Sequence, residues 1–139
     1  MVVSFVPYRI GDVFQLTLRE NDDYGTETIY EYDDNDVAFT LLVDDQPAAC
    51  FGIVEADKGV GFLWGYVSDR ANGHGKYMIR FLKGVLDRAM GRYHRLQSNV
   101  RADRKDYIRF SELLGLEKEA LMRKATANKM DLWLFARVE

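Results

Sequence analysis

Stretches of alternating apolar and polar side chains, and short apolar runs, recur along the chain. Both patterns are typical of β-strands. They predict strands at residues 2–8, 37–43, 48–55, 60–67, 96–100, 119–125 and 131–138. Turn-forming residues separate the second, third and fourth of these, at Asp44-Asp45-Gln46-Pro47 and at Asp57-Lys58-Gly59. We therefore expect an antiparallel meander from residue 37 to residue 67.

Helical spacing of apolar residues replaces this alternation after residue 75. A stripe of residues three and four positions apart predicts a helix over 75–93, formed by Tyr77, Met78, Phe81, Leu82, Val85, Leu86 and Met90. Gly84 interrupts the stripe and lowers helix propensity, so we expect it to mark close packing against a strand.

Capping residues predict two shorter helical stretches. One opens at Gly11-Asp12, with Asp12 as its N-cap. The other begins at Asp103 or Arg104 and ends at Leu113-Leu114-Gly115, where Gly115 has the position of a C-cap glycine.

The order of elements is therefore β, α, β, β, β, α, β, α, β, β. The strands at 60–67 and 96–100 flank the long helix as a βαβ unit, so they should run parallel. The sequence predicts one α/β (α+β) domain over residues 1–139. Its core should be a mixed, mainly antiparallel twisted sheet of about seven strands with helices on both faces.

Composition agrees with one soluble domain and narrows the partners. The 139 residues are 47% hydrophobic, which is enough for a single core. With 19 basic and 22 acidic residues the net charge is -3, which argues against general nucleic-acid binding. Basic residues do recur along and beside the long helix, but a solvated helix face explains them: Arg70, Lys76, Arg80, Lys83, Arg88, Arg92 and Arg95.

Cysteine, histidine and hydropathy exclude several further classes. Cys50 lies in the apolar run Ala48-Ala49-Cys50-Phe51, which favours a buried structural thiol over a nucleophile. Neither His74 nor His94 has a set of further ligands around it, so we expect no metal. No apolar run approaches the roughly 20 residues that span a bilayer. We expect a protein of the cytoplasm, with no membrane partner.

The segment 20–36 is acidic and rich in tyrosine, and two interpretations stay open. It fits a solvated loop with a short helix near residues 28–32. It also fits a surface that recognises a cationic substrate or a protein partner.

A glycine-containing loop joins the strand at 60–67 to the long helix. It reads Arg70-Ala71-Asn72-Gly73-His74-Gly75-Lys76, and it lies where backbone N–H groups are free and the helix dipole is positive. This favours anion binding over a turn without a ligand. The loop is not a P-loop, because Tyr77 follows Lys76, and it lacks the third glycine of a dinucleotide fingerprint.

The pattern Arg70-x-x-Gly73-x-Gly75 resembles the acetyl-CoA signature Gln/Arg-x-x-Gly-x-Gly/Ala of the GNAT N-acetyltransferase superfamily, and the predicted order of elements is similar to the GNAT fold. The resemblance implies acetyl-CoA as co-substrate and a small-molecule or peptide amine as acceptor. It also implies that the fourth strand splays from the fifth. Backbone groups of Tyr66, Val67 and Ser68 would then hold the pantetheine arm. The pyrophosphate would lie on the main-chain N–H groups of Asn72 to Lys76, within a cofactor-binding set of Arg70, Ala71, Asn72, Gly73, His74, Gly75, Lys76 and Arg104.

The catalytic pattern of the family is not matched. The family often carries Asn-x-x-Ala…Tyr-x-x-x-Gly-Phe, in which the tyrosine protonates the leaving thiolate. Counting back from Gly115 puts Ser111 at the tyrosine position and Arg104 at the asparagine position. Tyr107, one helical turn earlier, is the alternative acid or else a packing residue.

No carboxylate lies in the strand at 60–67 to act as a base. Glu55 and Asp69 flank that strand and are the candidates for a base that acts through water, although Glu55 also fits an exposed strand residue near a turn.

Two hypotheses follow: an active N-acetyltransferase, or a GNAT-like protein with a binding or structural role. Within the superfamily, Tyr107-Ile108-Arg109-Phe110 ahead of Leu114-Gly115 is similar to small acetyltransferase-like proteins of short-tailed bacteriophages. That resemblance implies action in the host cytoplasm or the virion. Family members often form homodimers through their closing strands, and here Trp133 and Phe135 serve either that interface or the core.

Overall fold

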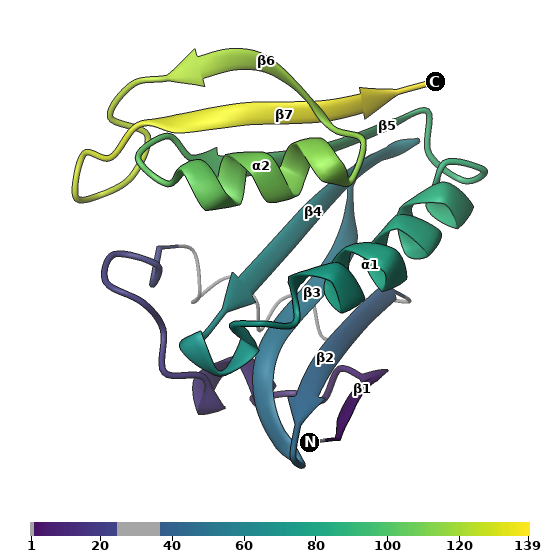
Figure 1. Cartoon of the computed structure of the whole chain (residues 1–139). Coiled ribbons are helices and arrows are strands. Elements are labelled where there is room, and N and C mark those ends of the chain that lie inside the picture. Colours follow the sequence, from purple (N-terminus) through teal and green to yellow (C-terminus); the bar gives the residue numbers. More distant parts are fainter. Residues whose placement is uncertain (1, 25–36) are drawn as a thin grey trace. The chain divides into compact units, whose positions relative to one another are not determined.

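The computed structural model describes residues 2–24 and 37–139 (Figure 1). These residues form seven strands, two 3₁₀ turns and two α-helices. Their bounds are β1 Val3–Pro7, η1 Asp12–Gln15, β2 Val37–Val43, β3 Gln46–Asp57, β4 Val60–Val67, η3 Asp69–Ala71, α1 Gly75–Ala89, β5 Arg95–Arg101, α2 Lys105–Leu113, β6 Glu117–Met122 and β7 Leu132–Val138.

The strands form one sheet in the order β1-β2-β3-β4-β5-β7-β6. β1 with β2, β2 with β3, β5 with β7 and β6 with β7 pair antiparallel, whereas β4 and β5 pair parallel. The predicted mixed, mainly antiparallel sheet of seven strands is confirmed. So is the predicted parallel βαβ unit.

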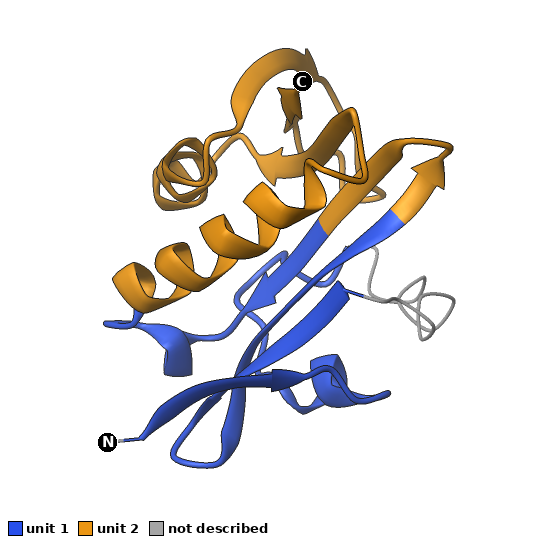
Figure 2. Cartoon of the chain, turned by 90° about the vertical axis from the view of Figure 1, so that its right-hand side faces the viewer, with its two compact units in different colours: residues 1–54, 64–74 blue, residues 55–63, 75–139 orange. Residues whose placement is uncertain are grey.

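Two compact units divide the chain (Figure 2). Unit 1 comprises residues 1–54 and 64–74, and unit 2 comprises residues 55–63 and 75–139. The boundary passes through β3 and β4, so each of these strands contributes to both units.

Aromatic packing organises the core of unit 1 around Trp64. A Cβ at Gly52 would lie 2.6 Å from the Trp64 ring, so only glycine leaves room for the indole. The ring of Tyr8 meets Trp64 edge-on, with centroids 5.5 Å apart. The indole N–H is buried and has no acceptor among the described residues.

The predicted burial of Cys50 is confirmed, because its side chain has no exposed surface. Burial raises the pKa of its thiol to about 12, which keeps it protonated and unreactive. Thr40 lies beside it and donates its hydroxyl to the Asp12 carboxylate over 2.7 Å.

The predicted N-cap at Asp12 is wrong. Gly11 is the cap residue, and the Asp12 carboxylate accepts hydrogen bonds from the Arg9 N–H and from Thr40 instead. The segment forms only the four-residue 3₁₀ turn η1. It ends there because the next residue, Leu16, has an extended backbone with φ -78° and ψ 138°.

The apolar stripe of α1 supplies the core of unit 2, with Met78, Leu82, Val85, Leu86 and Ala89 buried. The expectation that Gly84 marks close packing against a strand is wrong. A Cβ there would meet only the Arg88 side chain, at 3.8 Å. Phe135 is fully buried and belongs to the core, whereas the Lys118 ammonium lies 4.6 Å from the ring centroid of half-buried Trp133.

Predicted element boundaries shift by a few residues, mainly around β6. This strand begins at Glu117 because Gly115, at φ +91°, ends α2 and reverses the chain at once. It ends at Met122, before Lys124 adopts φ +51° and donates its N–H to the Asp131 carboxylate. The short helix predicted near residues 28–32 lies outside the described residues.

None of the helices in the described residues is long and apolar enough to cross a membrane. In residues 2–24 and 37–139, no group of three or more His, Cys, Asp or Glu side chains is arranged to hold a metal ion.

Candidate functional site

The glycine loop follows β4 as the sequence predicts. After Ser68 the chain makes the 3₁₀ turn η3, passes through Asn72, Gly73 and His74, and enters α1 at Gly75. Gly73 has φ +86°, a conformation that L side chains rarely adopt, and a Cβ there would meet nothing. Backbone conformation and open space are therefore what glycine provides at this position.

Hydrogen bonds within the loop show which backbone donors stay open. The N–H groups of Asn72 and His74 donate to the carbonyls of Asp69 and Ala71, over 3.0 and 3.1 Å. The N–H groups of Gly73, Gly75 and Lys76 have no acceptor in the part of the chain that the structure describes. Gly75 and Lys76 belong to the first turn of α1, which carries no acidic residue. These are the donors an anion would meet.

Ser68 fixes the start of the loop. Its N–H and its hydroxyl both donate to the Ala48 carbonyl, over 2.9 and 2.8 Å, and its backbone forms a bridge with Leu18. The amide of Ser68 is thus engaged within unit 1. Of the two residues before it, Val67 is half-buried, and the hydroxyl of Tyr66 donates to the Tyr24 carbonyl over 2.8 Å.

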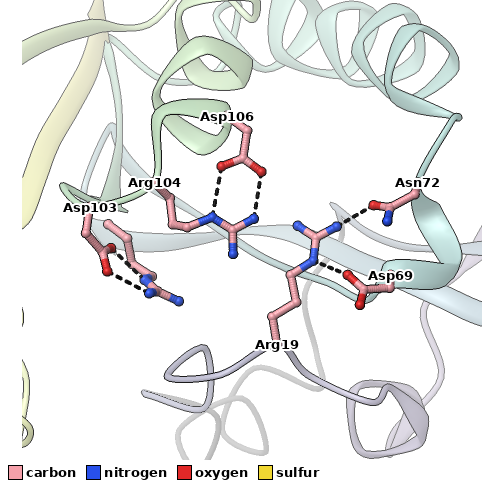
Figure 3. Close-up of polar contacts among 7 residues, drawn as sticks. Arg19, Asp69, Asn72, Asp103, Arg104 and Asp106 are labelled. Atoms are coloured by element: carbon pink, nitrogen blue, oxygen red, sulfur yellow. Dashed lines mark hydrogen bonds and ion pairs between the residues drawn. The ribbon is translucent and has the colours of Figure 1, made fainter.

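Arg19 makes two side-chain contacts to this loop that sequence reasoning missed (Figure 3). Its Nε donates to the Asp69 carboxylate over 2.6 Å, and its Nη2 donates to the Asn72 side-chain oxygen over 2.5 Å. Arg19 lies 50 residues from Asp69 along the chain. No local pattern marks such a pair, so only the fold reveals it.

In unit 2, Arg104 occupies the N-cap position of α2 without capping it through its side chain. Its guanidinium instead forms two hydrogen bonds with the Asp106 carboxylate, over 2.9 and 2.7 Å (Figure 3). It also lies 4.3 Å from the ring centroid of Tyr107. These hydrogen bonds hold the pKa of Asp106 below its ordinary value.

Ser111 and Tyr107 lie on one face of α2, one turn apart. Ser111 is buried, and its hydroxyl donates to the Tyr107 carbonyl over 3.1 Å. This is the back-bonding of a helical serine to the residue four positions earlier. The Ser111 hydroxyl proton is thus engaged within the helix. Tyr107 itself is half-buried.

A second arginine–aspartate pair precedes α2. The buried Arg101 guanidinium forms two hydrogen bonds with Asp103, over 2.9 and 2.8 Å, and these hold the pKa of Asp103 below its ordinary value. Sequence reasoning missed this pair too. The signal was present as two successive Arg-x-Asp spacings, Arg101-Ala102-Asp103 and Arg104-Lys105-Asp106.

Glu55 is exposed near the end of β3, beside the turn at residues 58–59 that leads into β4. Tyr66, Val67 and Ser68 lie at the other end of β4 or just after it. Glu55 is thus an exposed strand residue near a turn, at the opposite end of β4 from these three residues. The other candidate base, Asp69, is ion-paired to Arg19.

The parallel ladder of β4 and β5 is short. It joins Val60, Gly61 and Phe62 to Arg95, Leu96 and Gln97, and the Ser98 hydroxyl then donates to the Leu63 carbonyl over 2.9 Å.

Comparison with known proteins places the fold but not a family by sequence. No protein-family model and no curated protein matches the chain. Among solved structures, it is similar to the ribosomal-protein-S18-alanine N-acetyltransferase of Escherichia coli, with a TM-score of 0.76 at 16% identity over 99% of this chain and 94% of that one.

Two further structures agree. The NatC complex bound to Gag peptide and CoA matches with a TM-score of 0.77 at 11% identity, over 100% of this chain and 99% of that one. A GNAT-family acetyltransferase of Bacillus anthracis matches with a TM-score of 0.62 at 13% identity, over 73% of this chain and 65% of its own. At these identities the likeness concerns the fold alone: the chain has the fold of GNAT acetyltransferases.

Proposed function

We propose that this protein binds acetyl-CoA and transfers the acetyl group to an amine. The observation that carries the proposal is the set of open backbone donors at Gly73, Gly75 and Lys76, at the start of a helix whose first turn has no acidic residue. A structure of the same fold, the NatC complex, was solved with CoA and a peptide bound.

The cofactor would lie along the segment from Tyr66 to Lys76. The three open amides would bind the pyrophosphate, with the exposed side chains of Arg70 and Lys76 adding positive charge. Backbone groups of Tyr66 and Val67 would hold the pantetheine arm. The amide of Ser68 contributes less than the resemblance implies, because the Ala48 carbonyl already accepts from it.

Transfer requires attack of a neutral amine on the thioester carbonyl, loss of one proton from the amine nitrogen to a base or to water, and protonation of the thiolate that leaves. Positioning of the two reactants and backbone donors at the oxyanion can supply much of the acceleration. Tyr107 is our candidate for the acid, because the Ser111 hydroxyl already donates its hydrogen bond to the Tyr107 carbonyl. The acceptor would be a small-molecule or peptide amine, drawn in by the acidic sequence of segment 20–36.

Two measurements on the wild-type protein test this function. Calorimetry should show binding of acetyl-CoA and of CoA in the micromolar range. Incubation of acetyl-CoA with a panel of amines, peptides with free N-termini and aminoglycosides should release free CoA with at least one acceptor. Tight binding without CoA release across the panel would count against transfer, and absence of binding would count against the whole proposal.

The second candidate is a GNAT-like protein that binds without transferring. The contacts of Arg104 and Ser111 favour it, because both residues replace the usual residue types of the family pattern and both side chains bond to residues of α2. Such a protein would act in a phage virion or against a host target in the cytoplasm. The sequence 20–36, or a homodimer contact, would then provide the interface. Micromolar acetyl-CoA binding that Gly73→Trp abolishes, together with turnover, would reject it.

A further inference from the structure

We infer that Arg19 is the positioning residue of the anion-binding loop: it holds Asp69 and Asn72 in place and neutralises Asp69, so that a diphosphate can bind beyond them. The inference rests on the proposed function for its ligand. The contacts from which it is argued, those of Arg19 with Asp69 and Asn72, lie within unit 1. Arg19 belongs to neither the loop nor any motif of the sequence.

Three contacts join the two segments. Leu18 and Ser68 form an antiparallel bridge, which holds the segment that carries Arg19 next to the segment that carries Asp69. Arg19 then reaches Asp69 through Nε and Asn72 through Nη2. One guanidinium thus spans η3 from its first residue to the residue just past its end, which restricts how the loop ahead of Gly73 can move.

The exposed fractions of the partners show what the contact is for. The Arg19 side chain is 14% exposed and the Asp69 side chain is 78% exposed. An ion pair with so exposed a carboxylate adds little to the stability of a fold. The positional effect is larger, because one planar guanidinium that bonds two partners fixes the direction of each.

Charge gives Arg19 a second role. Asp69 lies four residues before Gly73, close along the chain to the open donors, and its carboxylate would repel a diphosphate. The Arg19 guanidinium at 2.6 Å cancels that charge locally. Without Arg19, the same loop would present an unpaired negative charge to its ligand.

The contact also orients Asn72. A guanidinium has only donors, so Asn72 must turn its side-chain oxygen toward Arg19. Its side-chain amide group then points elsewhere, and it has no acceptor among the described residues. This side-chain amide group is therefore a further hydrogen-bond donor for the diphosphate, in addition to the backbone N–H of Gly73.

A set of variants separates position from charge. Arg19→Met should raise the Kd for CoA by about tenfold, since it removes two charge-assisted hydrogen bonds from the loop. Asp69→Asn keeps an oxygen for Arg19 and removes the charge, so it should not raise the Kd. The double variant R19M/D69N should recover part of the loss, and Arg19→Lys should lie between Arg19→Met and wild type. For an active enzyme, the KM for acetyl-CoA should rise in Arg19→Met while kcat at saturation changes by less than about twofold.

The matched control is Arg137→Met. Arg137 forms a comparable ion pair with Asp87, over 2.7 Å, and Asp87 lies at the opposite end of α1 from the loop. This variant should leave the Kd for CoA within about twofold of wild type. A Kd for Arg19→Met no higher than that of the control would overturn the inference, as would full recovery in R19M/D69N, which would leave no positional part.

Hydrogen exchange on the free protein keeps the test independent of any ligand. The backbone amides of Asn72 and His74, which donate within the loop, should exchange faster in Arg19→Met than in wild type and unchanged in Arg137→Met. If wild type binds no CoA, the proposed function fails, and exchange still decides the role of Arg19. Equal exchange at these amides in Arg19→Met and wild type would overturn it.

Discussion

The glycine loop and helix α2 treat their polar groups in opposite ways. The loop leaves the N–H groups of Gly73, Gly75 and Lys76 without an acceptor among the described residues. In α2, by contrast, Arg104 pairs with Asp106 and Ser111 donates to the Tyr107 carbonyl. A segment with open donors is prepared for a ligand, whereas a segment whose side chains bond one another is prepared mainly to be stable.

This difference separates two properties that are joined in an acetyltransferase. Holding the cofactor depends on backbone geometry, which many sequences can supply once two glycines are present. Protonating a thiolate depends on one side chain of suitable acidity in one place. In our proposal, the open amides of the glycine loop supply the first property and Tyr107 supplies the second. The two regions can therefore be broken separately.

The largest expected effect is on the loop. Gly73→Trp places a side chain at φ +86° where the ligand would lie, so the Kd for CoA should rise by more than about a hundredfold. Gly11→Trp is the matched control, since Gly11 has φ +90° and also has open space around it. Calorimetric binding by Gly73→Trp equal to that of the control would show that the ligand, if any, lies elsewhere.

The next effect is on α2 and on turnover. Tyr107→Phe keeps the ring under Arg104 and removes the hydroxyl, so kcat should fall by about a hundredfold if the phenol is the acid. Ser111→Ala should leave kcat within about twofold of wild type, because the Ser111 hydroxyl already donates its hydrogen bond to a backbone carbonyl. Steady-state assays at saturating acetyl-CoA distinguish the two. A large loss in Ser111→Ala with none in Tyr107→Phe would reverse the assignment.

A stability change outside both regions sharpens the comparison. Gly84→Ala should raise the free energy of unfolding by about 0.5–1 kcal/mol, since the new Cβ meets only Arg88 in a helix interior. Urea denaturation measures this, and CoA binding should not change. A loss of stability would mean that Gly84 packs more tightly than its surroundings indicate.

The smallest effect concerns the pairing within α2. The pKa of Asp106 is lowered in the folded state, so its ion pair stabilises the fold above the unfolded pKa, and that stability is lost as pH falls through the folded value. Because the Asp106 side chain is 57% exposed, the contribution should stay below about 1 kcal/mol. The stability difference between wild type and Asp106→Asn should thus be constant from about pH 5 to 7 and shrink below about pH 4. A difference that grows on acidification would contradict the pairing.

Much of the fold could be predicted from the sequence, because its strands and its long helix carry clear periodicity. The strand Val60–Val67 and the start of α1 at Gly75 match the predicted residues. Asp12 was misassigned because a side chain that can cap a helix can equally bond Thr40, which is 28 residues away. Gly84 was misread because propensity says what a glycine costs, not what surrounds it.

For the site, the sequence predicted the loop and not what holds it. The loop is local, so its glycines and charges are visible in seven consecutive residues, Arg70 to Lys76. The Arg19 contacts join segments 50 and 53 residues apart and have no local signature. The Arg-x-Asp spacings at the start of α2 are visible in the sequence. They indicate an ion pair only if both side chains turn toward each other, and the spacing alone does not predict this.

The most direct test of the account is a ¹⁵N-resolved NMR titration of the wild-type protein with CoA. The backbone amides of Gly73, Gly75 and Lys76 should show the largest shifts and should saturate together in the micromolar range. The amides of Asn72 and His74, already bonded within the loop, should shift less, and that of Gly91 should stay unchanged. Saturating CoA that leaves the three open amides unmoved would contradict the claim that this loop holds the cofactor.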